Sequence, residues 1–237
     1  MPSIRKSIPN ILTLCNLLSG SIGISMTLAN NNLKGAFVAM MISAVFDILD
    51  GLSARLLDAR SDVGRELDSL SDLISFGLLP GFMMFVFMGN MFEIANVTLY
   101  MKYFALLMPA FAALRLAVFN TSEQSLKTFT GLSSPAAAIF VAGLVNNNFV
   151  AAMLQKTDYR IGLVIILLLI CCVCWLMVSR VKFLSFKFKS FGFKDNYLTY
   201  IFYSFSVILF VLFRIDAIIL IMCFYVILSL FFAKKIS

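Results

Sequence analysis

The sequence predicts an all-α, polytopic membrane protein, a bundle of about eight transmembrane helices with its N- and C-termini on the cytoplasmic side. Of its 237 residues, 61% are hydrophobic and only 13% are charged, and the mean hydropathy is +0.97. Soluble domains are roughly half apolar. Apolar runs of the ~20 residues that cross a bilayer as a helix recur along the whole chain. We therefore expect one membrane domain that covers residues 1–237.

The apolar runs between polar breaks define the expected spans. The first run follows Arg5 and Lys6, and no small-residue cleavage site comes after it, so we interpret it as a retained helix and not as a signal peptide. Pro80, Pro109 and Pro135 fall in or near spans, where proline kinks a helix or starts one. The expected spans are residues 11–30, 34–57, 65–89, 97–120, 132–153, 160–180, 197–213 and 216–233.

Lysine and arginine set the expected orientation. If the N-terminus is cytoplasmic, fourteen of the nineteen basic residues lie on the cytoplasmic side, as the positive-inside rule requires. The other side then holds five, namely Lys34, Lys102, Lys156, Arg160 and Arg214. The net charge of +7 follows mainly from this asymmetry, and the basic residues form no aromatic-interleaved patch for nucleic acid. We expect a multi-pass protein of the cell membrane.

The absent and apolar residues restrict the chemistry. The chain has no histidine, which excludes a His-ligated metal and Ser/His or Cys/His nucleophilic catalysis. All five cysteines lie in apolar runs, so we interpret them as packing residues. Any metal must therefore be a hard ion with oxygen ligands.

Acidic residues concentrate between Phe46 and Gly77, where seven of the twelve occur. At 100° per residue, two aspartates share a helical stripe with two small residues, and an arginine lies at its edge. These residues are Asp47, Asp50, Gly51, Ala54 and Arg55. After a polar break at residues 58–63, which we interpret as a cytoplasmic turn, a second helix has the same kind of stripe with Gly64, Asp68, Ser71, Asp72 and Ser75.

The four aspartates on these stripes require an explanation, because carboxylates this close in a medium of low dielectric repel one another. They must be protonated, paired or gathered around cations, and acids at membrane depth are seldom without function. Two divalent ions about 3.5 to 4 Å apart would clamp both oxygens of a phosphoryl displacement. Oxygen ligands favour Mg²⁺ or Mn²⁺. The remaining acids, Asp58, Asp62 and Glu66, are expected to be solvated or paired with Arg60 and Arg65.

The combined pattern resembles the signature of the CDP-alcohol phosphatidyltransferase family. Eight fixed residues match it over positions 47–72, in the form Asp-x-x-Asp-Gly-x-x-Ala-Arg, eight residues, then Gly-x-x-x-Asp-x-x-x-Asp. The resemblance implies that CMP is displaced from a CDP-linked lipid by an alcohol, with two cations held by Asp47, Asp50, Asp68 and Asp72. It further implies that Asp72 is the general base, that Gly51, Ala54, Arg55 and Gly64 border the cytidine diphosphate, and that the protein is a homodimer.

Segments outside the signature indicate the acceptor. "IPNILTLCNLLSG" (8–20), "LRLAVFN" (114–120), "FTGLSSPAAA" (129–138) and "LMVSRVKFLSFK" (176–187) resemble segments of the phosphatidylserine synthases in this family. The resemblance implies CDP-diacylglycerol and L-serine as substrates, with membrane lipids around the protein. Asn10 and Thr13 would contact the nucleotide, although Pro9 and Asn10 also fit a simple helix start.

The chain departs from these synthases at two positions, with Val118 where Arg is commoner and Ser133 where Pro is commoner. Without an arginine at 118, Arg115 is the expected partner for a carboxylate or phosphate, the alternative being a snorkelling side chain. The remaining candidates for binding the amino acid are polar residues that would also fit helix caps. They are Asn120, Thr130 and Ser134.

Two other functions remain open from the sequence. The same transfer could use glycerol 3-phosphate or an inositol phosphate, which calls for more positive charge around the acceptor. A cation transporter would distribute its acids through the membrane depth, whereas here they gather near one face. The basic stretch from Arg180 to Lys194 is expected to bind the cytoplasmic interface.

Overall fold

A computed structural model describes residues 4–59, 61–92, 100–121, 129–183 and 193–232. Almost all of these residues are helical, which confirms the all-α prediction. Within the described ranges, regular strand is limited to two antiparallel pairs of residues, β1 (Phe129–Thr130) and β2 (Lys182–Phe183). They pair Thr130 with Lys182 and join the segment before α7 to the segment after α9.

The N-terminal half forms three long membrane-capable segments. They are α1 (Ile4–Asn30), α2 (Leu33–Leu56) and a continuous run of α3 (Asp62–Asp72), the π-helix η1 (Leu73–Leu78) and α4 (Leu79–Met91). Side chains cap two of the starts, because Asn32 accepts a hydrogen bond from Gly35 N and Ser61 accepts one from Gly64 N. Asp58, with φ +47°, lies in the turn between α2 and α3, where a polar break was predicted. Arg60 lies outside the described residues.

The C-terminal half is built from shorter pieces. Ser133 caps α7 and Asn147 caps α8, each by accepting a hydrogen bond from a backbone N–H of the first turn. The elements are η2 (Lys102–Leu106), α6 (Leu107–Thr121), α7 (Ser134–Val145), α8 (Asn148–Lys156), α9 (Tyr159–Val178), α10 (Phe193–Phe213), η3 (Arg214–Asp216) and α11 (Ala217–Phe232).

Helix length and hydropathy support five or six of the eight predicted membrane spans. Five helical segments of the described chain are long and apolar enough to cross a membrane, or six if the bent pair α7 and α8 counts as one span. The pair bends by 58° at Asn146 and Asn147. The apolar parts of α10 and α11 are shorter, covering Thr199–Phe213 and Ala217–Ser229. At 1.5 Å per residue they reach only about 20 Å, against a hydrocarbon core of about 30 Å.

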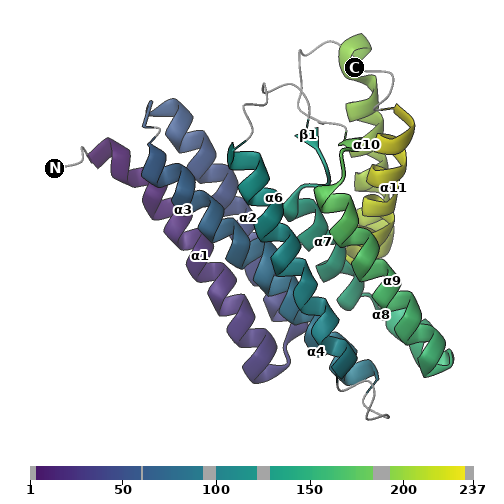
Figure 1. Cartoon of the computed structure of the whole chain (residues 1–237). Helices are drawn as coiled ribbons and strands as arrows, with labels where there is room; N and C mark the ends of the chain where they lie inside the picture. Colours follow the sequence, from purple (N-terminus) through teal and green to yellow (C-terminus); the bar gives the residue numbers. More distant parts are fainter. Residues whose placement is uncertain (1–3, 60, 93–99, 122–128, 184–192, 233–237) are drawn as a thin grey trace.

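The helices pack side by side along one common direction (Figure 1). α1 packs against α2 and α3, α4 packs against α7, and α6 packs against η1 and α9, while α11 contacts α7. The centre is filled by flexible and aromatic side chains such as Met40, Phe76, Met83, Met84 and Met108, all nearly or fully buried. This packing places α2 directly against α1, which also packs against α3.

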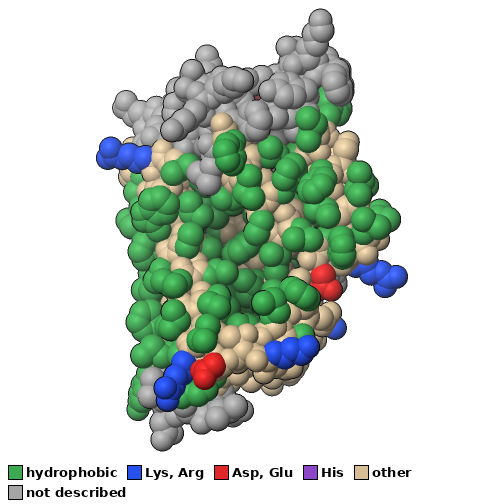
Figure 2. All heavy atoms as spheres, turned by 90° about the vertical axis from the view of Figure 1, so that its right-hand side faces the viewer, with side chains coloured by type: hydrophobic (Ala, Val, Ile, Leu, Met, Phe, Trp, Pro, Cys, Tyr) green, Lys and Arg blue, Asp and Glu red, His purple; other side chains and the backbone are tan. Residues whose placement is uncertain are grey.

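The surface matches a membrane environment. In Figure 2, hydrophobic side chains cover the band between the two ends of the molecule, and charged side chains lie toward its upper and lower edges. Four of the five free cysteines are partly or well exposed on this apolar exterior, and Cys174 is buried. The cysteines thus lie where lipid-facing or packing residues belong.

The π-helix η1 follows directly on Asp72, and its position has a local cause. Pro80, in the first turn of α4, lacks an N–H, so the carbonyl of Phe76 loses its usual partner four residues later. A widened turn accommodates this loss, and π-turns inside α-helices frequently occur at functional sites. Pro135 instead starts α7, as expected of a proline at a first helical turn.

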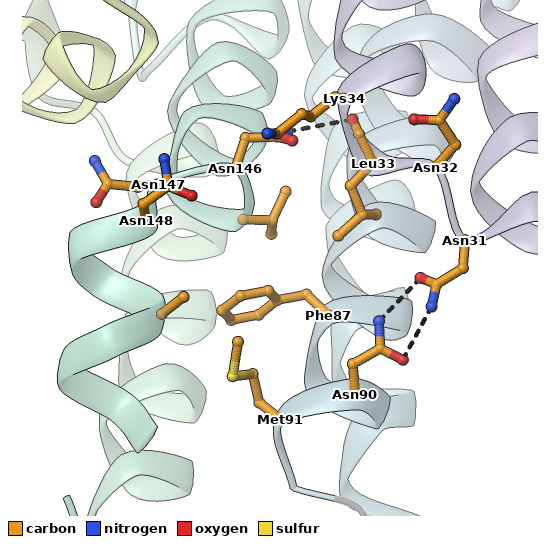
Figure 3. Close-up of a pocket in the computed structure, with 12 residues that line it drawn as sticks. Asn31, Asn32, Leu33, Lys34, Phe87, Asn90, Met91, Asn146, Asn147 and Asn148 are labelled. Atoms are coloured by element: carbon orange, nitrogen blue, oxygen red, sulfur yellow. Dashed lines mark hydrogen bonds between the residues drawn. The ribbon is translucent and has the colours of Figure 1, made fainter. Parts of the chain in front are cut away.

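Asparagines line a cavity of about 350 Å³ at the end of the bundle where α1 meets α2 and α7 meets α8 (Figure 3). Asn31 and Asn90 exchange two hydrogen bonds, of 2.9 and 3.4 Å. Asn146 Nδ2 donates to the carbonyls of Leu33 and Ala142. The amides therefore satisfy backbone groups at helix ends and tie the turns together. Sixteen residues of α2 separate Lys34 from Asp50, so about 24 Å lies between this end and the acidic residues.

Candidate active site

Three aspartate carboxylates converge where α2 faces α3. Asp47 and Asp50 come from α2 and Asp68 comes from α3, and one oxygen from each lies within 4.8 Å of the others. Asp50 is buried, and the other two are half-buried. The structure thus brings together three of the four aspartates on the two predicted stripes.

Asp72 lies one turn beyond Asp68, outside that close group of three but within its electrostatic field. Its carboxylate interacts electrostatically with those of Asp47 and Asp68, and with the guanidinium of Arg115 on α6. Asn16 Nδ2, on α1, donates a hydrogen bond of 3.4 Å to Asp72 Oδ1. Asp72 therefore has a different set of neighbours from the other three aspartates.

The helix α1 is held against the acidic elements by hydrogen bonds to its backbone. Ser43 of α2 and Ser75 of η1 both donate to the carbonyl of Asn16, at 3.1 Å each. Ser71 donates to the carbonyl of Thr13 at 3.1 Å. All three serines are fully buried. We call Ser43, Ser71 and Ser75 the serine clamp, and it fixes which α1 side chains face the carboxylates.

Thr13 is the first of these side chains. Its hydroxyl lies 2.7 Å from Asp50 Oδ2, to which it donates, and 3.0 Å from the carbonyl of Pro9. The shorter hydrogen bond is the stronger of the two, because its acceptor is a charged carboxylate oxygen. Thr13 therefore holds one oxygen of Asp50 in place.

A cavity of about 460 Å³ opens beside Asp50 and Asp68. A Cβ built on Gly51 would meet nothing within 4 Å, so this position leaves open space against the α2 backbone. The described residues lining the cavity are Pro9, Asn10, Thr13, Asp50, Gly51, Ala54, Ala59, Ser61, Asp62, Gly64, Arg65 and Asp68. They include seven of the ten positions named above as bordering the nucleotide or holding cations, and these seven come from α1, α2 and α3.

The arginine that lines the cavity is Arg65, and not Arg55 of the signature. Arg55 is exposed on α2 and is not among the residues that line the cavity, whereas Arg65 lines it. Arg65 also pairs with Asp62 at 3.5 Å and with Glu66 at 3.8 Å. The expected pairing of these two acids with Arg65 is thus present, and the contact of Arg55 with a ligand stays a prediction.

Two of the acceptor candidates contact other elements of the bundle. Arg115 Nη1 donates to Ser134 Oγ at 3.0 Å, while its buried Nε has no partner among the described residues. Asn120 Nδ2 donates to Ser69 Oγ at 2.8 Å and so joins α6 to α3. Ser133 rather than Ser134 caps α7, because its Oγ accepts from Ala136 N. Thr130 lies in β1, and its side chain lies outside the described part of the structure.

The donor set fits hard divalent cations. Oxygen atoms of three carboxylates converge, and Asp68 Oδ1 is buried without a hydrogen-bond partner in the described residues. A buried, unpaired carboxylate oxygen is unfavourable unless something else binds it. Mg²⁺ and Mn²⁺ prefer such ligands.

Two features of the site were not predicted from the sequence. Asn16 is fully buried beside Asp72, and the serine clamp sets its position. The available signal was a polar residue within an apolar run, three positions after Thr13, because such residues in membrane helices usually face the bundle. Arg65 and Ser61 also line the cavity. They lie in or beside the polar break of the sequence, where nothing separates a ligand-binding residue from a solvated one.

The fold and site together define a helical membrane-embedded protein whose clustered carboxylates border a cavity at one end of the bundle. A model of the CDP-alcohol phosphatidyltransferase family matches residues 6–185. This region contains every aspartate of the cluster, and the chain belongs to that family. Its members are phosphotransferases for substituted phosphate groups.

Curated relatives support this membership. A CDP-diacylglycerol–serine O-phosphatidyltransferase of Bacillus subtilis is 30% identical over 185 residues, covering 76% of this chain and 91% of the relative. One with the same name from Methanocaldococcus jannaschii is 33% identical over 196 residues, covering 81% of each. An archaetidylserine synthase of Methanothermobacter thermautotrophicus is 32% identical over 146 residues, covering 60% of this chain and 59% of the relative.

Proposed function

We propose that this chain is a phosphatidylserine synthase, which transfers the phosphatidyl group of CDP-diacylglycerol to the hydroxyl of L-serine and releases CMP. The observation that carries the proposal is the convergence of Asp47, Asp50 and Asp68 beside an open cavity in a member of this family. The names of the relatives support serine as acceptor.

The cavity beside Gly51 is the proposed site for the cytidine diphosphate. Gly51, Ala54 and Gly64 have little or no side chain there, so a bulky ligand can approach the helix backbones. Asn10 and Thr13 offer polar groups from α1. We assign Arg55 to the mouth of this site, where a small movement of its flexible side chain would reach a phosphate oxygen.

Asp47, Asp50, Asp68 and Asp72 would hold two divalent cations, Mg²⁺ or Mn²⁺, which when bound offset charge on the diphosphate and on the departing CMP. In the transfer, the serine oxygen forms a bond to phosphorus as the bond from phosphorus to the CMP oxygen breaks. Asp72 takes the proton of the serine hydroxyl, because a hydroxyl with a pKa far above 7 needs a base as it attacks. Phosphatidylserine and CMP are the products.

The acceptor side of the site is assigned to Arg115 and its neighbours. Arg115 is a cation within the electrostatic reach of Asp72, and Ser134 holds its guanidinium. A serine molecule whose hydroxyl faces Asp72 would place its carboxylate toward this charge. Asn120 and Thr130 complete the set of proposed acceptor contacts.

We assign the site to the cytoplasmic face of the cell membrane, with both termini on that face. This rests on the distribution of basic residues. With the bent pair α7 and α8 counted as one span, the number of spans stays even whether α10 and α11 both cross or neither does, and both termini then lie on the same face. The predicted homodimer belongs to this proposal as well.

The test is CMP release by purified protein in detergent with CDP-diacylglycerol, Mn²⁺ or Mg²⁺, and one acceptor at a time. We expect release with L-serine that Asp72→Asn abolishes. Release only with glycerol 3-phosphate or an inositol phosphate would keep the family chemistry and overturn the substrate. No release with any acceptor, together with nucleotide-independent ion uptake into proteoliposomes, would overturn the enzyme assignment in favour of transport.

A further inference from the structure

Asn16 has an unusual hydrogen-bonding state for a buried amide. Its side chain is fully buried in the membrane-spanning part of α1, and Nδ2 donates to Asp72 Oδ1 at 3.4 Å. Its Oδ1 is buried and has no partner among the described residues. An apolar side chain of similar size would avoid leaving this oxygen unpaired. The amide is therefore poorly explained by packing alone.

Other asparagines of the bundle show what a purely structural amide looks like here. Asn146 Nδ2 bonds two backbone carbonyls, and Asn147 uses both amide atoms, on Asp216 O and Val150 N. These two amides satisfy backbone groups at the α7 and α8 bend. Asn16 satisfies no backbone group with its side chain, and in the described structure its one side-chain bond goes to a carboxylate.

The position of Asn16 is fixed from two sides. Ser43 on α2 and Ser75 on η1 donate to its backbone carbonyl, and Gly20, one turn later, packs so tightly on Ser75 that an added Cβ would collide with it. The serine clamp therefore fixes the backbone of Asn16, and with it the point on α1 from which the amide reaches Asp72. The clamp and the amide together form a rigid support for Asp72.

Asp72 needs such a support because its neighbours repel it. It lies in the field of Asp47 and Asp68, and a carboxylate on a flexible χ angle would rotate away from them. The N–H donated by Asn16 holds one oxygen of the Asp72 carboxylate. Thr13 does the same for Asp50 from the preceding turn of α1. One helix thus orients one carboxylate on each of the two acidic helices.

We propose that Asn16 is a positioning residue that holds the Asp72 carboxylate in the orientation needed for cation binding and proton transfer. The expected effect on kcat rests on the proposed function. The expected effect on Mn²⁺ affinity does not depend on it. Asn16 would act through Asp72, because its side chain is fully buried and its described side-chain hydrogen bond goes to that carboxylate.

The test compares Asn16→Leu and Asn16→Ala with the control Thr27→Val. Thr27 lies on the same helix, is also fully buried, and donates only to the carbonyl of Gly23 within α1. Each variant is purified in detergent, and three quantities are measured: the thermal midpoint, the Mn²⁺ dissociation constant from the electron paramagnetic resonance signal of free Mn²⁺, and kcat with KM for both substrates.

We expect Asn16→Leu to raise the Mn²⁺ dissociation constant about tenfold and to lower kcat about 10- to 100-fold, as loss of an outer partner of a metal ligand does. KM for both substrates stays unchanged, and the thermal midpoint stays equal or rises, because an apolar side chain replaces an unpaired amide. Asn16→Ala should show the same loss of Mn²⁺ affinity with a lower midpoint, because it leaves a cavity. Thr27→Val should keep the wild-type Mn²⁺ affinity.

Wild-type Mn²⁺ affinity and kcat in both Asn16 variants would overturn the inference, as would a loss of thermal stability in Asn16→Leu with no change in ion binding. Asn16→Ala keeps the test decisive if the leucine does not fit. Failure of the proposed function gives a different result, because the wild-type protein would then release no CMP. The Mn²⁺ dissociation constants of the wild type and the variants could still be compared in that case.

Discussion

Thr13 Oγ1 on α1 lies 2.7 Å from Asp50 Oδ2 on α2, in a buried hydrogen bond between residues 37 positions apart. Both partners lie at the cavity beside Gly51. The bond makes the first membrane helix part of the acidic site, although the family signature begins only at Asp47. It also leads to the first of four predictions.

Thr13→Val removes the hydroxyl and keeps the shape of the side chain. Since hydrogen bonds to charged groups contribute about 1.5–3 kcal/mol, we expect the Mn²⁺ dissociation constant to rise roughly ten- to hundredfold. Isothermal titration of Mn²⁺ into the metal-free protein measures this. Thr13→Ser, which keeps the donor, should bind Mn²⁺ nearly as wild type does, and equal affinity in all three proteins would refute a role for this bond.

Asp72→Asn should lower kcat by at least about 10³-fold, because the amide cannot accept the acceptor's proton and general-base contributions reach about 10²–10⁴. CMP release under saturating substrates is the measurement. Glu66→Gln is a matched control on the same helix, since Glu66 is 63% exposed and its one ion pair among the described residues is with Arg65. Activity in Asp72→Asn comparable to that of Glu66→Gln would exclude Asp72 as the base.

Asp68→Asn should stabilise the metal-free protein and weaken its response to metal. Removing one charge relieves the repulsion within the group of three carboxylates, so the thermal midpoint in EDTA should rise. Wild-type protein at a hundred times the Mn²⁺ dissociation constant should gain about 2.7 kcal/mol, and the variant should gain much less at the same concentration. Differential scanning calorimetry with and without Mn²⁺ tests both effects, and an equal gain in the two proteins would contradict the cation site.

Gly51→Ala separates binding from folding. The new Cβ has open space around it, and alanine favours a helix over glycine by about 1 kcal/mol, so the thermal midpoint should not fall. KM for CDP-diacylglycerol should rise, because the methyl group enters the proposed nucleotide cavity. Gly23→Ala is the comparison: its Cβ would lie 2.7 Å from Leu79 Cδ2, so it should lower stability. An unchanged KM in Gly51→Ala would place the nucleotide elsewhere.

The helical bundle and the two helix faces that carry the aspartates could be predicted, because both depend on the local periodicity of the sequence. The apolar runs predicted a helix for each expected span, and the spacing of Asp47, Asp50 and Asp68 predicted that their faces could meet. Composition did not predict that α7 and α8 bend by 58° or that the apolar parts of α10 and α11 are shorter than a full span. A hydropathy count sums over a polar break such as Asn146–Asn148 and cannot show the direction in which the chain leaves it.

The parts of the site that sequence did not reveal depend on tertiary contacts. Asn16 and Ser75 are 59 positions apart, and nothing in their local sequence says that α1 and η1 touch at that point. The same holds for the contact of Arg115 with Ser134. Asn16 was assigned no role, and Ser75 was placed only on the second stripe. Arg115 was left between binding and snorkelling, and Ser134 between binding and capping, because a polar residue in an apolar run indicates an inward face but not its partner.

The serine clamp has a mechanical consequence. Ser43, Ser71 and Ser75 tie the middle of α1 to α2, α3 and η1, so a slide of α1 by one residue, about 1.5 Å, would strain three buried hydrogen bonds at once. On the far side of the site, the described part of the chain joins α6 to α3 through the single bond from Asn120 to Ser69. Movement of α1 along its axis is therefore opposed at three points at once, on three different elements.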